Sequence, residues 1–205
     1  MTYNKELVDN RLNQWKNCLA GYSLPTWDSL PNLELYMDQV IVLLTQYLEF
    51  FPNDKSEDKV ITASIINNYV RMKVMPAPVK KRYSRIHIAY LIIICTLKQT
   101  LNISHIQKML PLGLKEDEVK LLYNDFVSRQ KTVTLYFLDQ INTFSNPVPD
   151  PNGTTDYEVD SLILTSAIAS NLYKLLTESL VTLQNQDSED KSKAVGTKEK
   201  EKKDK

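Results

Sequence analysis

The sequence is poor in the residues from which catalytic, metal and cofactor sites are built. It holds two cysteines, two histidines and four glycines among 205 residues. Scattered along the chain, these Cys and His residues form no ligand set at metal-binding spacing, and two thiols are too few for a disulfide framework. Glycine-rich phosphate-binding motifs and nucleophile motifs are absent as well. We therefore expect a chain with reduced thiols that is not an enzyme and carries no metal or cofactor.

Long apolar runs are also missing. Met1 is followed by polar residues, so no secretory signal is visible. The longest apolar run, Ile88 to Cys95, is far shorter than the ~20 residues that span a bilayer. The chain is nevertheless 42% hydrophobic, which is enough to bury a core. We expect a cytoplasmic protein that does not engage a membrane.

Acidic residues are missing from the middle of the chain. The formal net charge is zero, yet the segment from Lys59 to Lys115 carries ten bases and no acid. Clustered cations attract a polyanion and displace its counterions, which favours nucleic acid as a partner. A solvated face that pairs with the acidic flanking segments would give the same pattern. Six of the bases lie close together: Arg71, Lys73, Lys80, Lys81, Arg82 and Arg85.

The spacing of apolar residues predicts helices in the first half of the chain. The first spans 4–20, and a Pro-containing loop follows over 24–31, pinned by Trp27 and Leu30. Asn32 is expected to cap a helix over 33–50. Thr62 should cap a short helix over 62–74, which the two prolines of 75–78 stop. A basic, exposed wing is expected over 79–85.

The second half of the chain should be helical too. Ser84 is the expected cap of a long helix to 101, and Ser104 opens a short one that ends at 110. Two longer helices are predicted over 116–144 and 157–183, separated by a turn-rich linker. We expect a helical domain over 1–112, a C-terminal helical region for dimerisation or sensing over 113–185, and a disordered charged tail over 186–205.

Two short motifs resemble the DNA-binding unit of MerR-type regulators. The stretch Tyr69-Val-Arg-Met-Lys-Val-Met-Pro76 is similar to the end of the second helix of that unit, with Lys73 where the pattern has Gly. Lys81-Arg-Tyr83-Ser84 is similar to the end of its wing. The resemblance covers 62–110 and implies an all-α fold, with a MerR-like winged helix-turn-helix core and additional C-terminal helices. In such proteins the second helix enters the major groove.

A longer stretch is similar to a bacterial family known as domain of unknown function 1836. The resemblance spans 24–109 and rests on LPTWDSLPNLELYMDQV and ITASIINNYVRMKVMPAPVKKRYSRIHIAYLIIICTLKQ, in that order. The family is regarded as MerR-like, so the resemblance implies the same core. It names no target for this core.

The predicted function is bacterial transcription regulation through double-stranded DNA. Asn pairs with adenine and Arg with guanine in the major groove, and phosphates need only charge and reach. A homodimer through the C-terminal helices would read two half-sites, and those helices leave room for an unidentified small-molecule effector. The alternative is a non-enzymatic protein–protein interaction module that uses the same basic face. Expected base contacts are Ser64, Asn67, Asn68 and Arg71; expected phosphate contacts are Lys73, Lys80, Lys81, Arg82, Tyr83 and Arg85.

Three side chains in this region have structural explanations as well. Tyr83 is either a core residue that anchors the wing or a phosphate contact through its hydroxyl. His87 stands one turn into a buried helix and is expected to pack or cap. Cys95 lies in an apolar stripe and is expected to be an inert core thiol.

Overall fold

The computed structural model describes residues 5–48, 61–145 and 155–200, and the elements within these ranges are helical. The all-α fold class is therefore confirmed. Two isolated antiparallel bridges are the extended pairings in the described part. The helices are α1 (Lys5–Gly21), a 3-10 turn η1 (Trp27–Ser29), α2 (Met37–Leu48), α3 (Ala63–Arg71), α4 (Arg85–Leu97), α5 (Ile103–Met109), α6 (Glu116–Ser145) and α7 (Thr155–Lys200).

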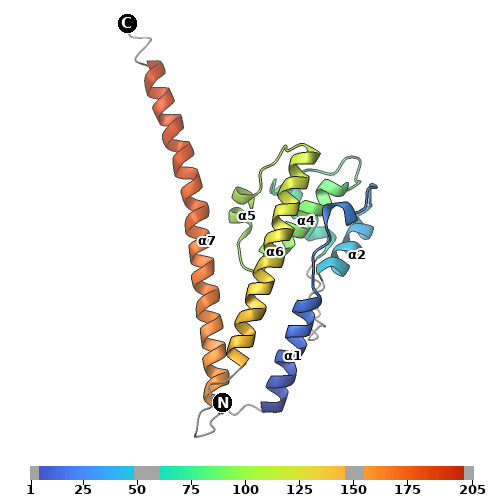
Figure 1. Ribbon diagram of the computed structural model, residues 1–205. Coiled ribbons are helices and arrows are strands. Elements are labelled where there is room, and N and C mark those ends of the chain that lie inside the picture. Colours follow the sequence, from blue (N-terminus) through green and yellow to red (C-terminus); the bar gives the residue numbers. More distant parts are fainter. Residues whose placement is uncertain (1–4, 49–60, 146–154, 201–205) are drawn as a thin grey trace.

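The core is organised around α4. Every residue from His87 to Cys95 is buried, so this helix is enclosed on all sides rather than amphipathic. It contacts α2 and α6, and the loop that carries η1 packs against α6 (Figure 1). As predicted, Trp27 and Leu30 pin this loop, each being 2% exposed. The short helices α3 and α5 add Ile66, Tyr69 and Ile106 to the same core.

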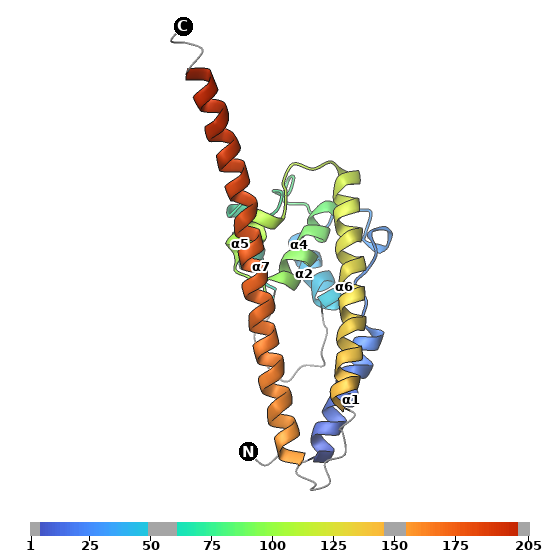
Figure 2. The same cartoon turned by 60° about the vertical axis from the view of Figure 1, so that its left-hand side comes forward.

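The long helices extend away from the core. The second half of α6 lies beside α1, while α7 runs along another side of the molecule and contacts α5 (Figures 1 and 2). Among the described residues, no helix has both the length and the apolarity that a bilayer span requires. The predicted linker between α6 and α7 lies mostly outside the described residues.

The prediction that Asn32 caps a helix from 33 onward is wrong. The chain bends at 32–33, Leu35 pairs with Tyr83 in an antiparallel bridge, and α2 begins only at Met37. The backbone N–H of Tyr36 donates to Gln39 Oε1 at 2.9 Å, so Tyr36 takes the capping position. Within 33–36, Leu35 is buried and paired, whereas Leu33 and Tyr36 are exposed, so this stretch forms no helix face.

Apart from the C-terminal end of α7, the other helix boundaries differ from the prediction by about one turn or less. The short helix predicted over 62–74 ends at Arg71, and α4 ends at Leu97. Asn102 rather than Ser104 caps α5, because its Oδ1 accepts the backbone N–H of His105 at 3.0 Å. The tail, expected to be disordered from 186, is continued as helix to Lys200, in keeping with the helix propensity of Lys, Glu and Ala.

Candidate nucleic-acid interface

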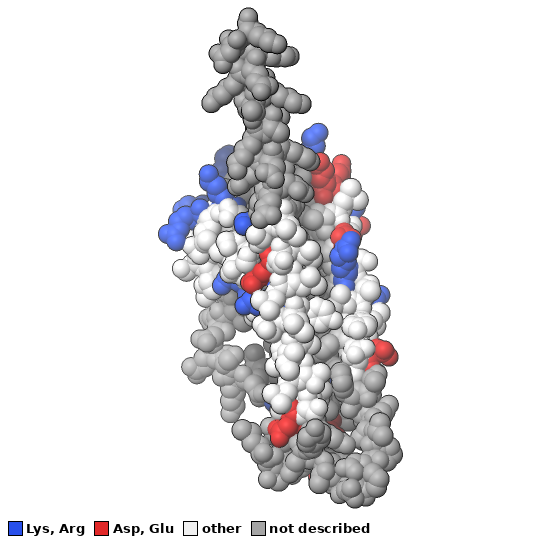
Figure 3. All heavy atoms as spheres, turned by 90° about the vertical axis from the view of Figure 1, so that its left-hand side faces the viewer, with Lys and Arg blue, Asp and Glu red and all other residues white. Residues whose placement is uncertain are grey.

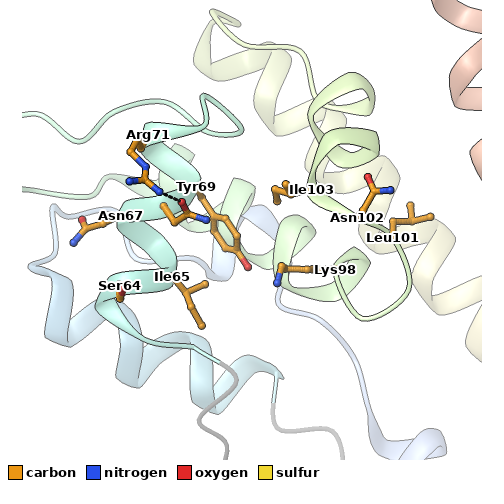
Figure 4. A pocket seen from close by; sticks show the side chains of 10 residues that line it. Ser64, Ile65, Asn67, Tyr69, Arg71, Lys98, Leu101, Asn102 and Ile103 are labelled. Atoms are coloured by element: carbon orange, nitrogen blue, oxygen red, sulfur yellow. Dashed lines mark hydrogen bonds between the residues drawn. The ribbon is translucent and has the colours of Figure 1, made fainter.

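Helix α3 presents a polar face to solvent and an apolar face to the core. Thr62 caps it as predicted, since its hydroxyl oxygen accepts the backbone N–H of Ile65 at 3.3 Å. Ile66 and Tyr69 are buried, whereas three expected base contacts are exposed on the opposite side. Figure 4 shows the Asn67 side chain pointing away from the neighbouring α4–α5 turn. The exposed residues are Ser64, Asn67 and Arg71.

Asn68 and Arg71 form a hydrogen-bonded pair on this surface. The Arg71 guanidinium donates to Asn68 Oδ1 at 2.8 Å, and the Asn68 amide nitrogen lies 3.5 Å from the sulfur of Met72. Asn68 is half-buried, so it is less accessible than its neighbours. The bond restrains the guanidinium along the helix surface before any ligand arrives. The contact of Asn68 with a base stays a prediction.

A left-handed turn at Lys73 ends α3. The backbone N–H of Val74 donates to the Tyr69 carbonyl and that of Lys73 to the Val70 carbonyl, each at 3.0 Å. These are the two bonds of a Schellman motif, whose left-handed position is usually glycine. Lys73 has a φ of 53°, a conformation that costs a residue with a side chain roughly 1–2 kcal/mol. The turn thus keeps the shape that glycine favours and adds an exposed cation.

The segment 79–83, which we call the basic turn, reverses the chain between α3 and α4. The backbone N–H of Arg82 donates to the Val79 carbonyl at 2.9 Å. Between them, Lys80 and Lys81 have φ values of 50° and 62°. Two consecutive positive φ values are typical of a type I′ hairpin turn, for which Asn-Gly is the favoured pair. Both lysines and Arg82 are exposed, so the tip of the turn presents three adjacent cations.

The base of the turn is fixed to the core. Arg82 donates to the Tyr36 hydroxyl at 2.8 Å and lies 4.7 Å from the centre of its ring. The Tyr83 side chain is only 2% exposed and meets the ring of His87 edge-on, at 5.6 Å between centroids. Tyr83 is therefore a core anchor, and the alternative role as a phosphate contact is not supported.

Arg85 also differs from the prediction. Its guanidinium donates to the Leu30 carbonyl at 3.1 Å and lies 5.6 Å from the centre of the Trp27 ring. The side chain is half-buried, and its Nε has no hydrogen-bond partner. These contacts join α4 to the η1 loop, so we remove Arg85 from the expected phosphate contacts.

A groove of about 960 Å³ lies between α3 and the α4–α5 turn. Its walls are partly apolar, with Ile65 on the α3 side and Leu101 and Ile103 on the side of the α4–α5 turn. Lys98, at the end of α4, adds an exposed cation to the far wall (Figure 4). Lys98 was not among the expected contacts, although its place in the acid-free segment was a signal. All four expected base contacts, Ser64, Asn67, Asn68 and Arg71, border this groove.

The two residues expected to be structural behave as predicted. Nδ1 of His87 accepts the backbone N–H of Ser84 at 3.0 Å, which leaves Nε2 to donate to the Ala77 carbonyl at 3.2 Å. Burial lowers the pKa of His87 and so favours this neutral form. Burial raises the pKa of the Cys95 thiol to about 12, which makes it unreactive. His87 thus caps and packs, and Cys95 is a core thiol.

The described residues contain no group of three or more His, Cys, Asp or Glu side chains arranged for a metal ion. Seven of the expected contacts are exposed, and they fall into two groups. One is the polar face of α3 with Lys73, and the other is the tip of the basic turn. Charge and hydrogen-bond donors, rather than a nucleophile or a general base, are what these groups offer.

Comparison with known proteins supports the longer of the two resemblances. Residues 25–126 match the family described as Domain of unknown function (DUF1836). The match covers η1, α2–α5 and the first part of α6, and so includes the whole candidate interface. No curated protein matches the chain, and neither does any solved structure.

Proposed function

We propose that this protein is a bacterial transcriptional regulator that binds double-stranded DNA through α3 and the basic turn. In this proposal α3 enters the major groove, and the basic turn acts as a wing on the adjacent backbone, as in a MerR-like winged helix-turn-helix. Asn67 and Arg71 offer the donors and acceptors that adenine and guanine edges require. Lys73, Lys80, Lys81 and Arg82 contact phosphates.

The backbone conformation of three lysines carries the proposal. Lys73, Lys80 and Lys81 all have φ values between 50° and 62°, where glycine or asparagine would be less strained. Lysine at these exposed turns contributes no packing that offsets the strain. Strained residues cluster at functional sites, where their side chains are needed despite the energetic penalty. What these side chains add is positive charge, in a segment without a single acid.

The arrangement of the two groups supports a duplex partner. The face of α3 is polar, with Ser64, Asn67 and Arg71 exposed, and such groups match the hydrogen-bond donors and acceptors of base edges. The basic turn carries point charges on a fixed backbone, which suits phosphates. Lys98 borders the groove beside α3 and supplies a further cation.

The proposal is tested by fluorescence anisotropy of a labelled random-sequence duplex titrated with the full chain at several salt concentrations. Wild type should bind, and log K should fall linearly with log salt. Lys80→Ala/Lys81→Ala should weaken binding and reduce the magnitude of the salt slope by about 1.8, because each phosphate contact contributes about 0.9. Arg71→Ala should also weaken binding relative to wild type. In addition, it should change the bases that are preferred after selection from a random pool of duplexes.

A matched control removes two exposed lysines elsewhere. Lys131→Ala/Lys174→Ala lowers the charge of the chain by the same amount, on α6 and α7 rather than on the basic turn. Its affinity and salt slope should equal those of wild type. Equal losses of DNA affinity in the two double variants would mean that only the overall charge of the chain matters. Unchanged DNA binding by Arg71→Ala and by Lys80→Ala/Lys81→Ala would exclude the proposed interface.

One observation favours the alternative, a protein partner on the same basic face. Val79 is 65% exposed and Tyr36 is 52% exposed, so apolar side chains accompany the cations of the basic turn. Protein interfaces use such aromatic and aliphatic anchors, whereas phosphate contacts do not need them. Val79→Ser should leave DNA affinity unchanged under the proposal; a loss specific to an acidic protein partner would favour the alternative.

A further inference from the structure

Helix α7 exposes an extensive apolar surface. Nine of its large apolar side chains are at least 48% exposed, which far exceeds what isolated surface residues explain. Soluble monomers rarely leave contiguous apolar patches of more than a few hundred Å² in water. The nine are Ile163, Leu164, Ile168, Leu172, Tyr173, Leu175, Leu176, Leu180 and Leu183.

Among the described residues, the rest of the chain covers one side of α7. Val181 is buried, and Glu178 lies 3.5 Å from Nδ1 of His105 on α5. Leu172 precedes Val181 by nine residues, which at about 100° per residue places it on the opposite side of the helix. Ile168 and Leu175 lie near Leu172 on the same side. We call this side, from Leu164 to Leu183, the outer face of α7.

The outer face carries no charge. Between Val159 and Leu183 the ionisable acids and bases are Asp160, Lys174 and Glu178. At about 100° per residue all three point within about 60° of Val181, toward the occupied side. Figure 3 views the molecule from the α7 side and shows the described part of this helix as largely uncharged surface.

We propose that the outer face of α7 pairs with the same face of a second copy of this chain. Because the face is uncharged, a two-fold arrangement sets no like charges against each other, although identical residues meet near the axis. From Val159 to Leu183 the helix is about 36 Å long, at 1.5 Å per residue. Ile163 lies on the same side as Val181, and the other eight side chains, at roughly 100 Å² each, would bury about 800 Å² per partner, the size of a stable interface.

The pairing would also set the separation of the two candidate interfaces. α7 contacts α5, and Gln107 on α5 donates to the Met72 carbonyl at the end of α3 at 3.0 Å. A chain of direct contacts thus connects the outer face to the end of α3. This consequence rests on the proposed function, whereas the pairing itself does not require DNA binding.

The experiment is sedimentation velocity of the full chain over a range of concentrations without DNA. Wild type should sediment as a dimer, and Leu172→Glu/Leu175→Glu should raise the dissociation constant roughly tenfold or more, because it buries four carboxylates at the two-fold axis. Leu121→Glu is the control, since Leu121 is 71% exposed on α6, away from the outer face, and should leave the dimer intact. Thermal unfolding of each variant verifies that residues 25–126 still fold.

A crosslinking measurement keeps the proposal testable if the glutamate variant does not fold. In a Cys18→Ser background, Leu172→Cys should form a disulfide-linked dimer under mild oxidation, whereas Leu121→Cys should not. The remaining Cys95 is buried and does not compete. A monomeric wild type, a dimer that survives Leu172→Glu/Leu175→Glu, or a monomer that binds phosphatidylcholine vesicles through this face would each overturn the proposal. If the chain is a monomer and still binds DNA, the pairing is overturned but the proposed function is not.

Discussion

Leu35 and Tyr83 exchange two backbone hydrogen bonds, each 2.8 Å long, although they are far apart in the sequence. The pairing joins the segment before α2 to the base of the basic turn. Tyr36 extends the connection by accepting a hydrogen bond from Arg82. The segment before α2 therefore contacts the basic turn through both backbone and side-chain hydrogen bonds. These contacts fix the base of the turn from which the cations project.

The Tyr83 side chain distinguishes a structural role from a binding role. Tyr83→Phe keeps the buried ring and removes the hydroxyl, so it should leave DNA affinity unchanged and alter the free energy of unfolding by less than about 1.5 kcal/mol. Tyr83→Ala should lower the free energy of unfolding by about 3–5 kcal/mol because it leaves a cavity under the basic turn. Urea denaturation and duplex anisotropy measure the two effects. Weaker DNA binding by Tyr83→Phe with unchanged stability would restore the phosphate role.

The strained lysines of the basic turn predict opposite effects on stability and binding. Lys80→Asn/Lys81→Gly supplies the pair favoured in a type I′ turn, so it should raise the free energy of unfolding by about 0.5–1 kcal/mol. The same variant loses two cations and should bind DNA more weakly, as Lys80→Ala/Lys81→Ala does. Lys80→Arg/Lys81→Arg is the control that keeps charge and strain. Destabilisation by Asn-Gly would show that the lysines pack, and would remove the argument for a function.

Lys98 tests the groove beside α3. Lys98→Ala should weaken duplex binding about equally for all sequences and reduce the magnitude of the salt slope by about 1, as expected for one phosphate contact. Lys108→Ala is the matched control, because Lys108 is also an exposed lysine of the acid-free segment but does not line the groove. If the two variants lose affinity equally, the groove has no special part in binding.

Local signals in the sequence predicted much of the fold. The Thr62 cap, the anchoring of the η1 loop and the capping role of His87 depend on residues within one or two turns, or on burial that an apolar pattern reveals. The extended pairing of Leu35 was missed because its partner is remote in sequence and 33–36 is apolar enough for a helix. Arg85 was misassigned for the same reason, since its partners Trp27 and Leu30 come from a distant loop.

The candidate site was predicted in composition more than in geometry. Exposed polar residues on α3 followed from helical spacing, and the structure agrees for Ser64, Asn67 and Arg71. The hydrogen bond between Asn68 and Arg71 depends on side-chain rotamers that spacing does not determine. Left-handed φ values at lysine also run against residue preference, so no propensity argument anticipates them.

His87 should make stability depend on pH. Burial lowers its pKa in the folded protein, while the unfolded chain titrates near the ordinary value of about 6.5. Below that pH the unfolded state binds the extra proton, so the free energy of unfolding is fully retained above about pH 6.5 and falls as the pH drops. The slope from one proton is at most about 1.4 kcal/mol per pH unit.

The matching variant is His87→Gln. Glutamine three residues after a capping serine can accept the same backbone N–H of Ser84, so the cap is kept and the titration is lost. Urea denaturation at pH 7.5 and pH 5.5 should show a smaller loss of stability on acidification for His87→Gln than for wild type. Equal losses in the two proteins would mean that His87 is protonated as readily in the folded state as in the unfolded chain, contrary to its burial beneath the basic turn.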